Sequence, residues 1–139
     1  MKRVLLDTNV ILDFLLKRKP NYGYAKTIIK EIVDGNIQGY ITASMVTDIF
    51  YLLQKTNGKT FALDTLVDLL IIIDVLTVYR DDVYSVIYLG WDDFEDALQV
   101  HVAIRSGMDA IVTRNVKDYK KAKNIDIVLP HEFIQYLEE

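Results

Sequence analysis

Four aspartates that lie far apart in the sequence could act together. Asp7 directly follows an apolar run, and Asp48, Asp96 and Asp118 each lie near the start or end of another expected element. Carboxylates packed together repel one another and cannot all stay ionised without a compensating charge. Mg²⁺ and Mn²⁺ prefer oxygen ligands, whereas zinc prefers histidine and cysteine, and this chain has few histidines and no cysteine. A Mg²⁺ or Mn²⁺ ion held by carboxylates commonly serves phosphoryl chemistry.

The elements that would position these acids alternate between strands and helices. We expect strands at residues 2–6, 40–42, 73–78, 110–113 and 125–129. We expect helices at 10–16, 22–34, 44–56, 60–72, 81–89, 92–107 and 130–137, with Ser44, Thr60 and Asp92 as N-caps. This alternation is typical of a parallel sheet with helices on both faces and right-handed crossovers.

This topology brings the acids together. Open α/β sheets bind ligands beyond the carboxyl ends of their strands, where the strand order reverses. Asp7 follows the first strand, Asp48 lies in the first turn after the second, and Asp118 follows the fourth. The short linker at 107–109 places the end of the preceding helix at the bottom of the fourth strand, so the start of that helix, with Asp96, lies near the top. We therefore predict that the four carboxylates meet at one edge of the sheet.

Each acid also has a purely structural interpretation. Asp7 could cap a helix, and Asp48 could simply favour the helix dipole. In the acidic run before residue 97 we expect Asp92 to be the cap, Glu95 to bond back to it, and Asp93 to be an accessory ligand. The coincidence of several acids at one edge favours the functional interpretation.

Polar and basic residues beside the acids are candidates for substrate binding or for supporting the ligands. They are Thr8, Asn9, Asp93, Thr113, Arg114, Asn115 and Lys117. The basic stretch at 114–123 is most often a solvated surface, but beside a metal site it could hold a phosphate backbone. Lys17, Arg18 and Lys19 form a second basic group of this kind.

Composition limits the class of protein. The chain has 139 residues, which fits a single domain spanning 1–139. The net charge of −4 counts weakly against a nucleic-acid binder, although acids that hold cations account for part of it. The longest apolar run, 66–78, contains two aspartates and is too short to span a membrane. An aspartate at position 7 does not suit a secretory signal, so we expect a cytoplasmic protein.

Several segments resemble the motifs of PIN domains, in the same order. They are Val4–Asp13, Asp93–Gln99, Ile111–Asn115 continuing through Asp118–Tyr119, and Leu129–Phe133. The resemblance implies a three-layer α/β/α fold with a parallel five-stranded sheet of order 3-2-1-4-5. It also implies Mg²⁺- or Mn²⁺-dependent cleavage of RNA, with Asp7, Asp48, Asp96 and Asp118 as the acidic quartet. Many small prokaryotic relatives, the VapC-type toxins, are neutralised by a partner antitoxin and form dimers.

Two positions depart from the pattern of the family. The second acid is often glutamate, and Asp48 is one methylene shorter. The fourth motif commonly has an acid two residues after its threonine, where this chain has Asn115, and Asp118 is the candidate to supply the charge instead.

We therefore expect a metal-dependent endoribonuclease that acts as the toxin of a toxin–antitoxin pair. In this interpretation water attacks the phosphodiester in line and leaves a 5′-phosphate and a 3′-hydroxyl. One alternative is a phosphatase of the haloacid-dehalogenase type, since Asp7–Val10 loosely resembles its nucleophile motif, with Asn9 in place of the second aspartate. Another is a catalytically weak α/β domain that binds a partner.

Overall fold

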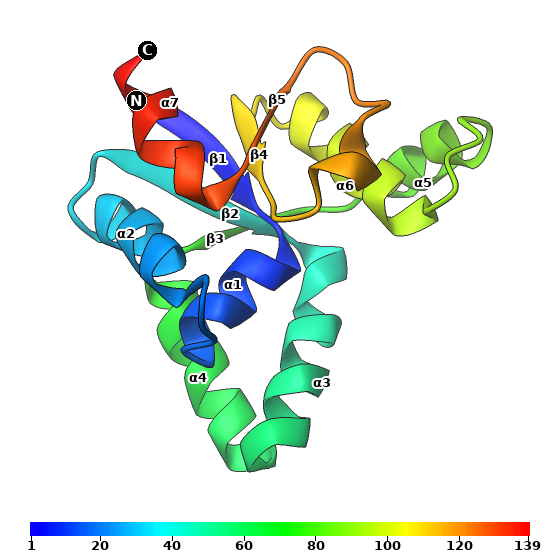
Figure 1. The fold of residues 1–139 in the computed structure, drawn as a ribbon. Coiled ribbons are helices and arrows are strands. Elements are labelled where there is room, and N and C mark those ends of the chain that lie inside the picture. The colour runs from blue at the N-terminus through cyan, green and yellow to red at the C-terminus, as the bar shows by residue number, and fades with distance from the viewer.

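The computed structural model describes residues 1–139 and is built on a five-stranded parallel sheet (Figure 1). The strand order β3-β2-β1-β4-β5 confirms the expected topology. The strands are β1 (Lys2–Leu6), β2 (Ile37–Thr42), β3 (Asp74–Leu76), β4 (Ala110–Val112) and β5 (Asp126–Val128).

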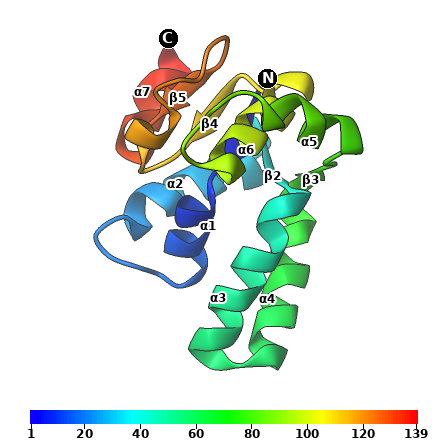
Figure 2. The same ribbon diagram turned by 90° about the vertical axis from the view of Figure 1, so that its right-hand side faces the viewer.

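Helices cover both faces of the sheet, which gives three layers. They are α1 (Thr8–Leu15), α2 (Tyr22–Val33), α3 (Val46–Asn57), α4 (Lys59–Ile72), α5 (Arg80–Ile87), α6 (Phe94–Arg105) and α7 (Phe133–Glu138). Figure 1 places α1 and α2 on one side of the sheet and α5 and α6 on the other. The α3–α4 pair extends away from the sheet (Figure 2). None of the helices combines the length and the apolar character that crossing a membrane would require.

The central strand β1 explains where the functional edge lies. Val4, Leu5 and Leu6 are completely buried, as expected for a strand covered by helices on both faces. β1 pairs in parallel with β2 on one side and with β4 on the other. The chain builds the sheet in one direction through β3 and then returns to the other side of β1 with β4. The strand order therefore reverses between β1 and β4, and a crevice forms beyond their carboxyl ends.

The turn between α6 and β4 confirms the argument that placed Asp96 near this edge. Gly107 follows the end of α6 with a φ of +77°, a conformation that glycine adopts without strain. The connection that follows is short, because β4 begins at Ala110. The C-terminal end of α6 therefore lies at the bottom of β4, and its N-terminal end lies at the ligand-binding edge.

Several expected boundaries were wrong. β2 begins at Ile37 rather than at residue 40, and β3 is shorter than 73–78. Ser44 caps no α-helix, because it lies inside the 3₁₀ turn η1 (Ala43–Met45). Thr60 lies inside α4, whose N-cap is Gly58. At the C-terminus, Pro130 opens the 3₁₀ turn η3 (Pro130–Glu132), and α7 begins only after it.

Candidate active site

An open pocket of about 510 Å³ lies at this edge, and it contains all four predicted acids. The side chains that line it come from α1, α3, α6 and the segment after β4. Among the residues singled out from the sequence, those in the lining are Asp7, Thr8, Asn9, Arg18, Asp48, Asp93, Glu95, Asp96, Arg114, Asn115 and Asp118. Another open pocket, between β5 and α7, contains none of them. The predicted meeting of the acids is therefore present in the structure.

Asp7 is held most firmly. It caps α1, and its Oδ1 accepts a bond of 2.8 Å from the backbone N–H of Thr8. Its Oδ2 accepts a bond of 2.7 Å from the hydroxyl of Thr113 and a longer one of 3.4 Å from the Asn9 amide. Asp7 as a whole is only 7% exposed. The structural and functional interpretations of Asp7 are compatible, because the capped carboxylate still lines the pocket.

Asp48 lies in the first turn of α3, as predicted, and faces Glu95. Burial, followed by the charge and hydrogen bonding of Asp48, raises the pKa of Glu95 to about 7. Glu95 does not bond back to a cap, which corrects our expectation. Its Oε1 accepts a bond of 3.2 Å from the Gln99 amide instead. Glu95 is thus an additional carboxylate of the pocket that sequence reasoning assigned to a structural role.

Asp96 lies among the other acids at the start of α6. Burial, followed by the charges of Asp93 and Asp7, raises its pKa to about 6, and Asp118 adds to this effect. The N-cap of α6 is Asp93 rather than Asp92, since Asp93 accepts a bond of 3.0 Å from the backbone N–H of Asp96. Asp118 lies in the 3₁₀ turn η2 (Val116–Tyr119).

Tyr119 is a buried contributor that the sequence did not reveal. Its hydroxyl lies 3.1 Å from Asp7 Oδ2 and 2.9 Å from Gln99 Oε1. The Tyr119 hydroxyl also lowers the pKa of the Asp96 carboxyl. Burial and the charges of Asp7 and Asp96 raise the pKa of the Tyr119 hydroxyl, so this group stays protonated and acts as a donor. Its position directly after Asp118 was the available signal.

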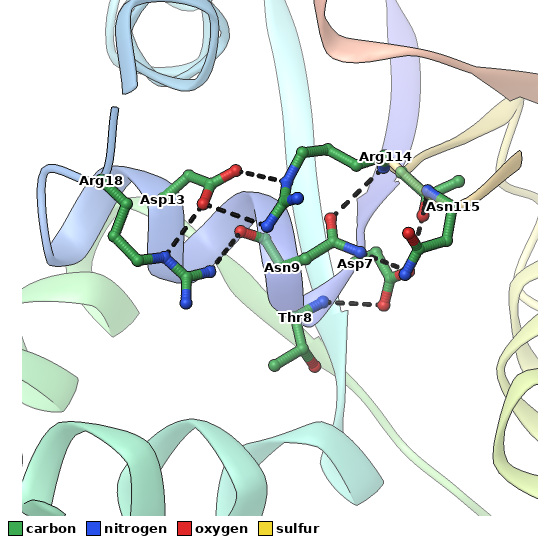
Figure 3. Close-up of polar contacts among 8 residues, drawn as sticks. Asp7, Thr8, Asn9, Asp13, Arg18, Arg114 and Asn115 are labelled. Atoms are coloured by element: carbon green, nitrogen blue, oxygen red, sulfur yellow. Dashed lines mark hydrogen bonds and ion pairs between the residues drawn. The ribbon is translucent and has the colours of Figure 1, made fainter. Parts of the chain in front are cut away.

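Asp13 is a second residue that we did not single out. It is 2% exposed and lies on α1 between two arginines (Figure 3). Arg18 Nε donates to its Oδ1 at 3.0 Å, and Arg114 Nε donates to its Oδ2 at 2.7 Å. A lone acid within an apolar helical segment was the signal for a buried ion pair. Both arginines line the pocket, whereas Asp13 lies behind them.

Two predicted contacts lie outside the main pocket. Thr113 is completely buried and acts through Asp7, and its own oxygen accepts a bond of 3.0 Å from the backbone N–H of Asn115. Lys117 lines a neighbouring hollow of about 280 Å³ together with Lys120, Lys121 and four aspartates. Asp96 and Asp118 belong to both hollows, so the basic stretch adjoins the acids.

The donors in the pocket suit a hard divalent cation. The acids supply only oxygen atoms, and burial together with neighbouring carboxylates raises the pKa values of Glu95 and Asp96. The Thr8 hydroxyl is buried and has no hydrogen-bond partner. No three Asp, Glu or His side chains are arranged as a ready-made ligand group. The residues thus fit an oxygen-coordinated ion, although they converge on the pocket without forming a preformed cage.

This combination of fold and site defines a class of protein. The family model described as the PIN domain matches residues 3–117. The chain therefore belongs to the PIN-domain family, as its motifs indicated.

Individual relatives are similar along most of the chain. Ribonuclease VapC1 of Aquifex aeolicus (strain VF5) is 24% identical, with 96% of this chain and 94% of the relative aligned. DNA-bound VapBC from Salmonella typhimurium superposes with a TM-score of 0.70 at 16% identity, covering 94% of this chain and 99% of the other. VapBC2 from Rickettsia felis, bound to a DNA fragment from its promoter, has a TM-score of 0.68 at 18% identity, covering 91% and 98%. These structures establish the similarity of fold.

Proposed function

We propose that this protein is a Mg²⁺- or Mn²⁺-dependent endoribonuclease whose catalytic residues are Asp7, Asp48, Asp96 and Asp118. The observation that carries the proposal is the meeting of these acids in one pocket of a PIN fold, where none of the four forms an ion pair with a lysine or arginine of the chain. The similarity to Ribonuclease VapC1 supports RNA as the substrate. Membership of the PIN family sets aside the phosphatase alternative.

The four acids have different proposed roles. Asp7, Asp96 and Asp118 would hold the metal ion, and Asp48 would bind it or orient the attacking water. A bound divalent ion activates water and stabilises the charge that develops on the phosphate. The Thr8 backbone and the Thr113 hydroxyl fix the orientation of Asp7, so that little reorganisation is needed when substrate arrives.

The two departures from the family pattern have local compensation. Glu95 stands beside Asp48, so the pocket keeps a longer carboxylate close to the position of the shorter one. Asn115 places a neutral oxygen in the lining, and Asp118 lies a few residues further on in the same pocket. The carboxyl groups available at these two positions are therefore Glu95 beside Asp48 and Asp118 beyond Asn115.

The decisive experiment compares Asp96→Asn with the wild-type protein in an RNA cleavage assay. We expect at least about a hundredfold loss of magnesium-dependent cleavage, because removing a group that stabilises the transition state commonly costs this much. EDTA should abolish wild-type cleavage. Asp68→Asn, an exposed acid on α4, is the matched control and should cleave normally. Undiminished cleavage by purified Asp96→Asn protein would refute the assignment.

We further propose that residues 1–139 fold as one domain that acts as the toxin of a toxin–antitoxin pair. Structural neighbours that were solved as VapBC complexes support a protein partner. The exposed side of α4 carries apolar side chains at helical spacing, namely Leu63, Val67, Leu70 and Ile71. Val67→Glu combined with Ile71→Glu should reduce co-purification with the product of a neighbouring small gene while leaving cleavage intact. A second copy of this chain is the other partner to test, by measuring the mass of the protein in solution.

A further inference from the structure

Arg18 and Arg114 form a basic pair on the wall of an otherwise acidic pocket. They lie 96 positions apart in the sequence and are joined by one buried carboxylate, Asp13 (Figure 3). Arg114 also donates from Nη2 to Asp13 Oδ1 at 3.3 Å, so its guanidinium binds both oxygens. Two guanidinium groups on one carboxylate leave a net positive charge, which the ion pairs do not neutralise.

The exposure of the three side chains shows which part of this cluster faces outward. The side chain of Asp13 is 3% exposed, whereas those of Arg18 and Arg114 are 40% and 35% exposed. Nη1 of each arginine makes no hydrogen bond within the chain, while the other side-chain nitrogens are engaged. Asp13 therefore orders the two guanidinium groups from behind and leaves a donor of each available at the pocket.

Asn9 connects this pair to the acids. Its backbone oxygen accepts a bond of 3.2 Å from Arg18 Nη2, and its side-chain oxygen accepts one of 3.3 Å from the Arg114 backbone N–H. The amide nitrogen of the same side chain donates to Asp7. The basic pair and Asp7 are thus held in a defined relationship by one residue.

We propose that Arg18 and Arg114 form a binding site for a phosphate of the RNA backbone, adjacent to the phosphate that is cleaved, and that Asp13 is the positioning residue of this site. The inference rests on the proposed ribonuclease function. Arginine suits this role, since its planar donors match phosphate geometry and its charge is permanent. The acidic part of the pocket repels a polyanion, so a nearby basic pair gives the substrate a defined place to bind and a direction.

The first test measures binding rather than cleavage. A fluorescent single-stranded RNA oligonucleotide is titrated in EDTA with the wild-type protein, Arg18→Gln, Arg114→Gln and the double variant. Arg80→Gln is the matched control, because Arg80 is exposed on α5 and bonds only to the Tyr84 hydroxyl. We expect about tenfold weaker binding for each pocket variant. We also expect the slope of log Kd against log salt to fall by about 0.7 when one phosphate contact is lost. Arg80→Gln should change neither quantity.

The second test separates positioning from stability. Asp13→Asn should weaken RNA binding in the wild-type background and have no further effect on binding in the Arg18→Gln/Arg114→Gln background. A purely structural Asp13 would lower Tm and leave the salt slope unchanged. If Asp13→Asn protein does not fold, Asp13→Glu tests the same role, since it keeps the carboxylate but displaces the oxygens that bind the two arginines. In the magnesium-dependent reaction, Arg18→Lys should raise KM several-fold with little change in kcat.

The outcomes are distinguishable. If the wild-type protein cleaves RNA but the arginine variants bind it as tightly and with the same salt slope, the phosphate site is wrong and the proposed function stands. If inorganic phosphate at millimolar concentration competes with RNA for the wild-type protein but not for the double variant, the site recognises phosphate. Absence of both cleavage and binding by the wild-type protein overturns the proposed function and this inference together.

Discussion

The two ends of α6 hold carboxylates in opposite ways. At the N-terminal end, Glu95 and Asp96 lie among other acids, and their pKa values are raised to about 7 and about 6. At the C-terminal end, Arg105 binds Asp82 of α5 through Nε at 2.6 Å and Nη2 at 2.9 Å. Burial opposes ionisation of Asp82, but the bonds from Arg105 and from the Tyr79 backbone outweigh it and lower its pKa.

Asp82 and the acids at the other end of α6 differ in whether the chain itself supplies a neutralising cation. Asp82 is 1% exposed and also lies 3.2 Å from the His101 ring, so every oxygen has a partner within the chain. Arg105 continues to the Thr77 backbone oxygen and locks α5 onto α6. At the other end of α6, the groups with the largest influence on Glu95 and Asp96 are carboxylates and Tyr119, with no arginine or lysine among them. Burial of a carboxylate alone therefore does not indicate a functional site, whereas a cluster of carboxylates that raise one another's pKa favours one.

The largest effect on stability should come from breaking the ion pair between Asp82 and Arg105 at the C-terminal end of α6. We expect Asp82→Asn to lower the free energy of unfolding by about 2 kcal/mol. Breaking a fully buried pair costs about 3–5 kcal/mol, and Arg105 stays partly hydrated. Urea unfolding measures the change, with the exposed neighbour Asp81→Asn as the control. A variant as stable as the wild-type protein would mean that the Arg105 pair does not hold the two helices together.

Removing a carboxylate at the N-terminal end of α6 should change the free energy of unfolding in the opposite direction. In EDTA at pH 8, we expect Asp96→Asn to raise the free energy of unfolding by about 1 kcal/mol, because the substitution removes a repelled charge and solvent screening limits the gain. The same variant should lose RNA cleavage. A decrease in stability would indicate that Asp96 is structural, and the comparison between the two ends of α6 would fail.

The pH dependence of these two variants sharpens the contrast. The folded pKa of Asp96, about 6, lies above the ordinary value of 3.8, so its destabilising effect develops as the pH rises from about 4 to 6. The folded pKa of Asp82 lies below 3.8, so its contribution is present above that pH and is lost as the pH falls through the folded value. As the pH falls, the gain in stability of Asp96→Asn and the loss of stability of Asp82→Asn, each relative to the wild-type protein, should therefore both decrease towards zero. Unfolding curves between pH 3 and 8 in EDTA measure this.

The parallel α/β sheet and the position of the acids could be predicted because they depend on local patterns and on topology, whereas the strand order was implied only by the resemblance to PIN domains. Asp7 follows an apolar run, and parallel strands bring their carboxyl ends to one edge. The caps could not be predicted in the same way. Asp92 and Asp93 are chemically equivalent in the sequence, and only the backbone angles of the folded chain select Asp93. Gly58 caps α4 without a side chain, so no capping residue marked that boundary.

The partners of the buried acids were not predictable because they are distant in sequence. Asp13 and Arg114 are 101 positions apart, and many other basic residues were equally available to Asp13. Tyr119 could have been surface or core, and only its packing against Asp7 and Gln99 defines its role. Sequence patterns thus identify the residues that could do chemistry, whereas compensation between charges depends on tertiary contacts.

The smallest expected effect concerns Tyr119, which is a neutral donor among the uncompensated acids. Tyr119→Phe keeps the buried ring but removes the hydroxyl that serves Asp7 and Gln99. We expect a cost of about 1 kcal/mol in stability, typical of a lost buried hydrogen bond, and a reduction in RNA cleavage of about tenfold at fixed magnesium. A magnesium titration of the cleavage rate distinguishes the cause. If the hydroxyl only orients Asp7, saturating magnesium should restore most of the rate, whereas Asp96→Asn should stay inactive at every concentration. An unchanged magnesium dependence together with a wild-type rate would mean that the acid cluster does not need this donor.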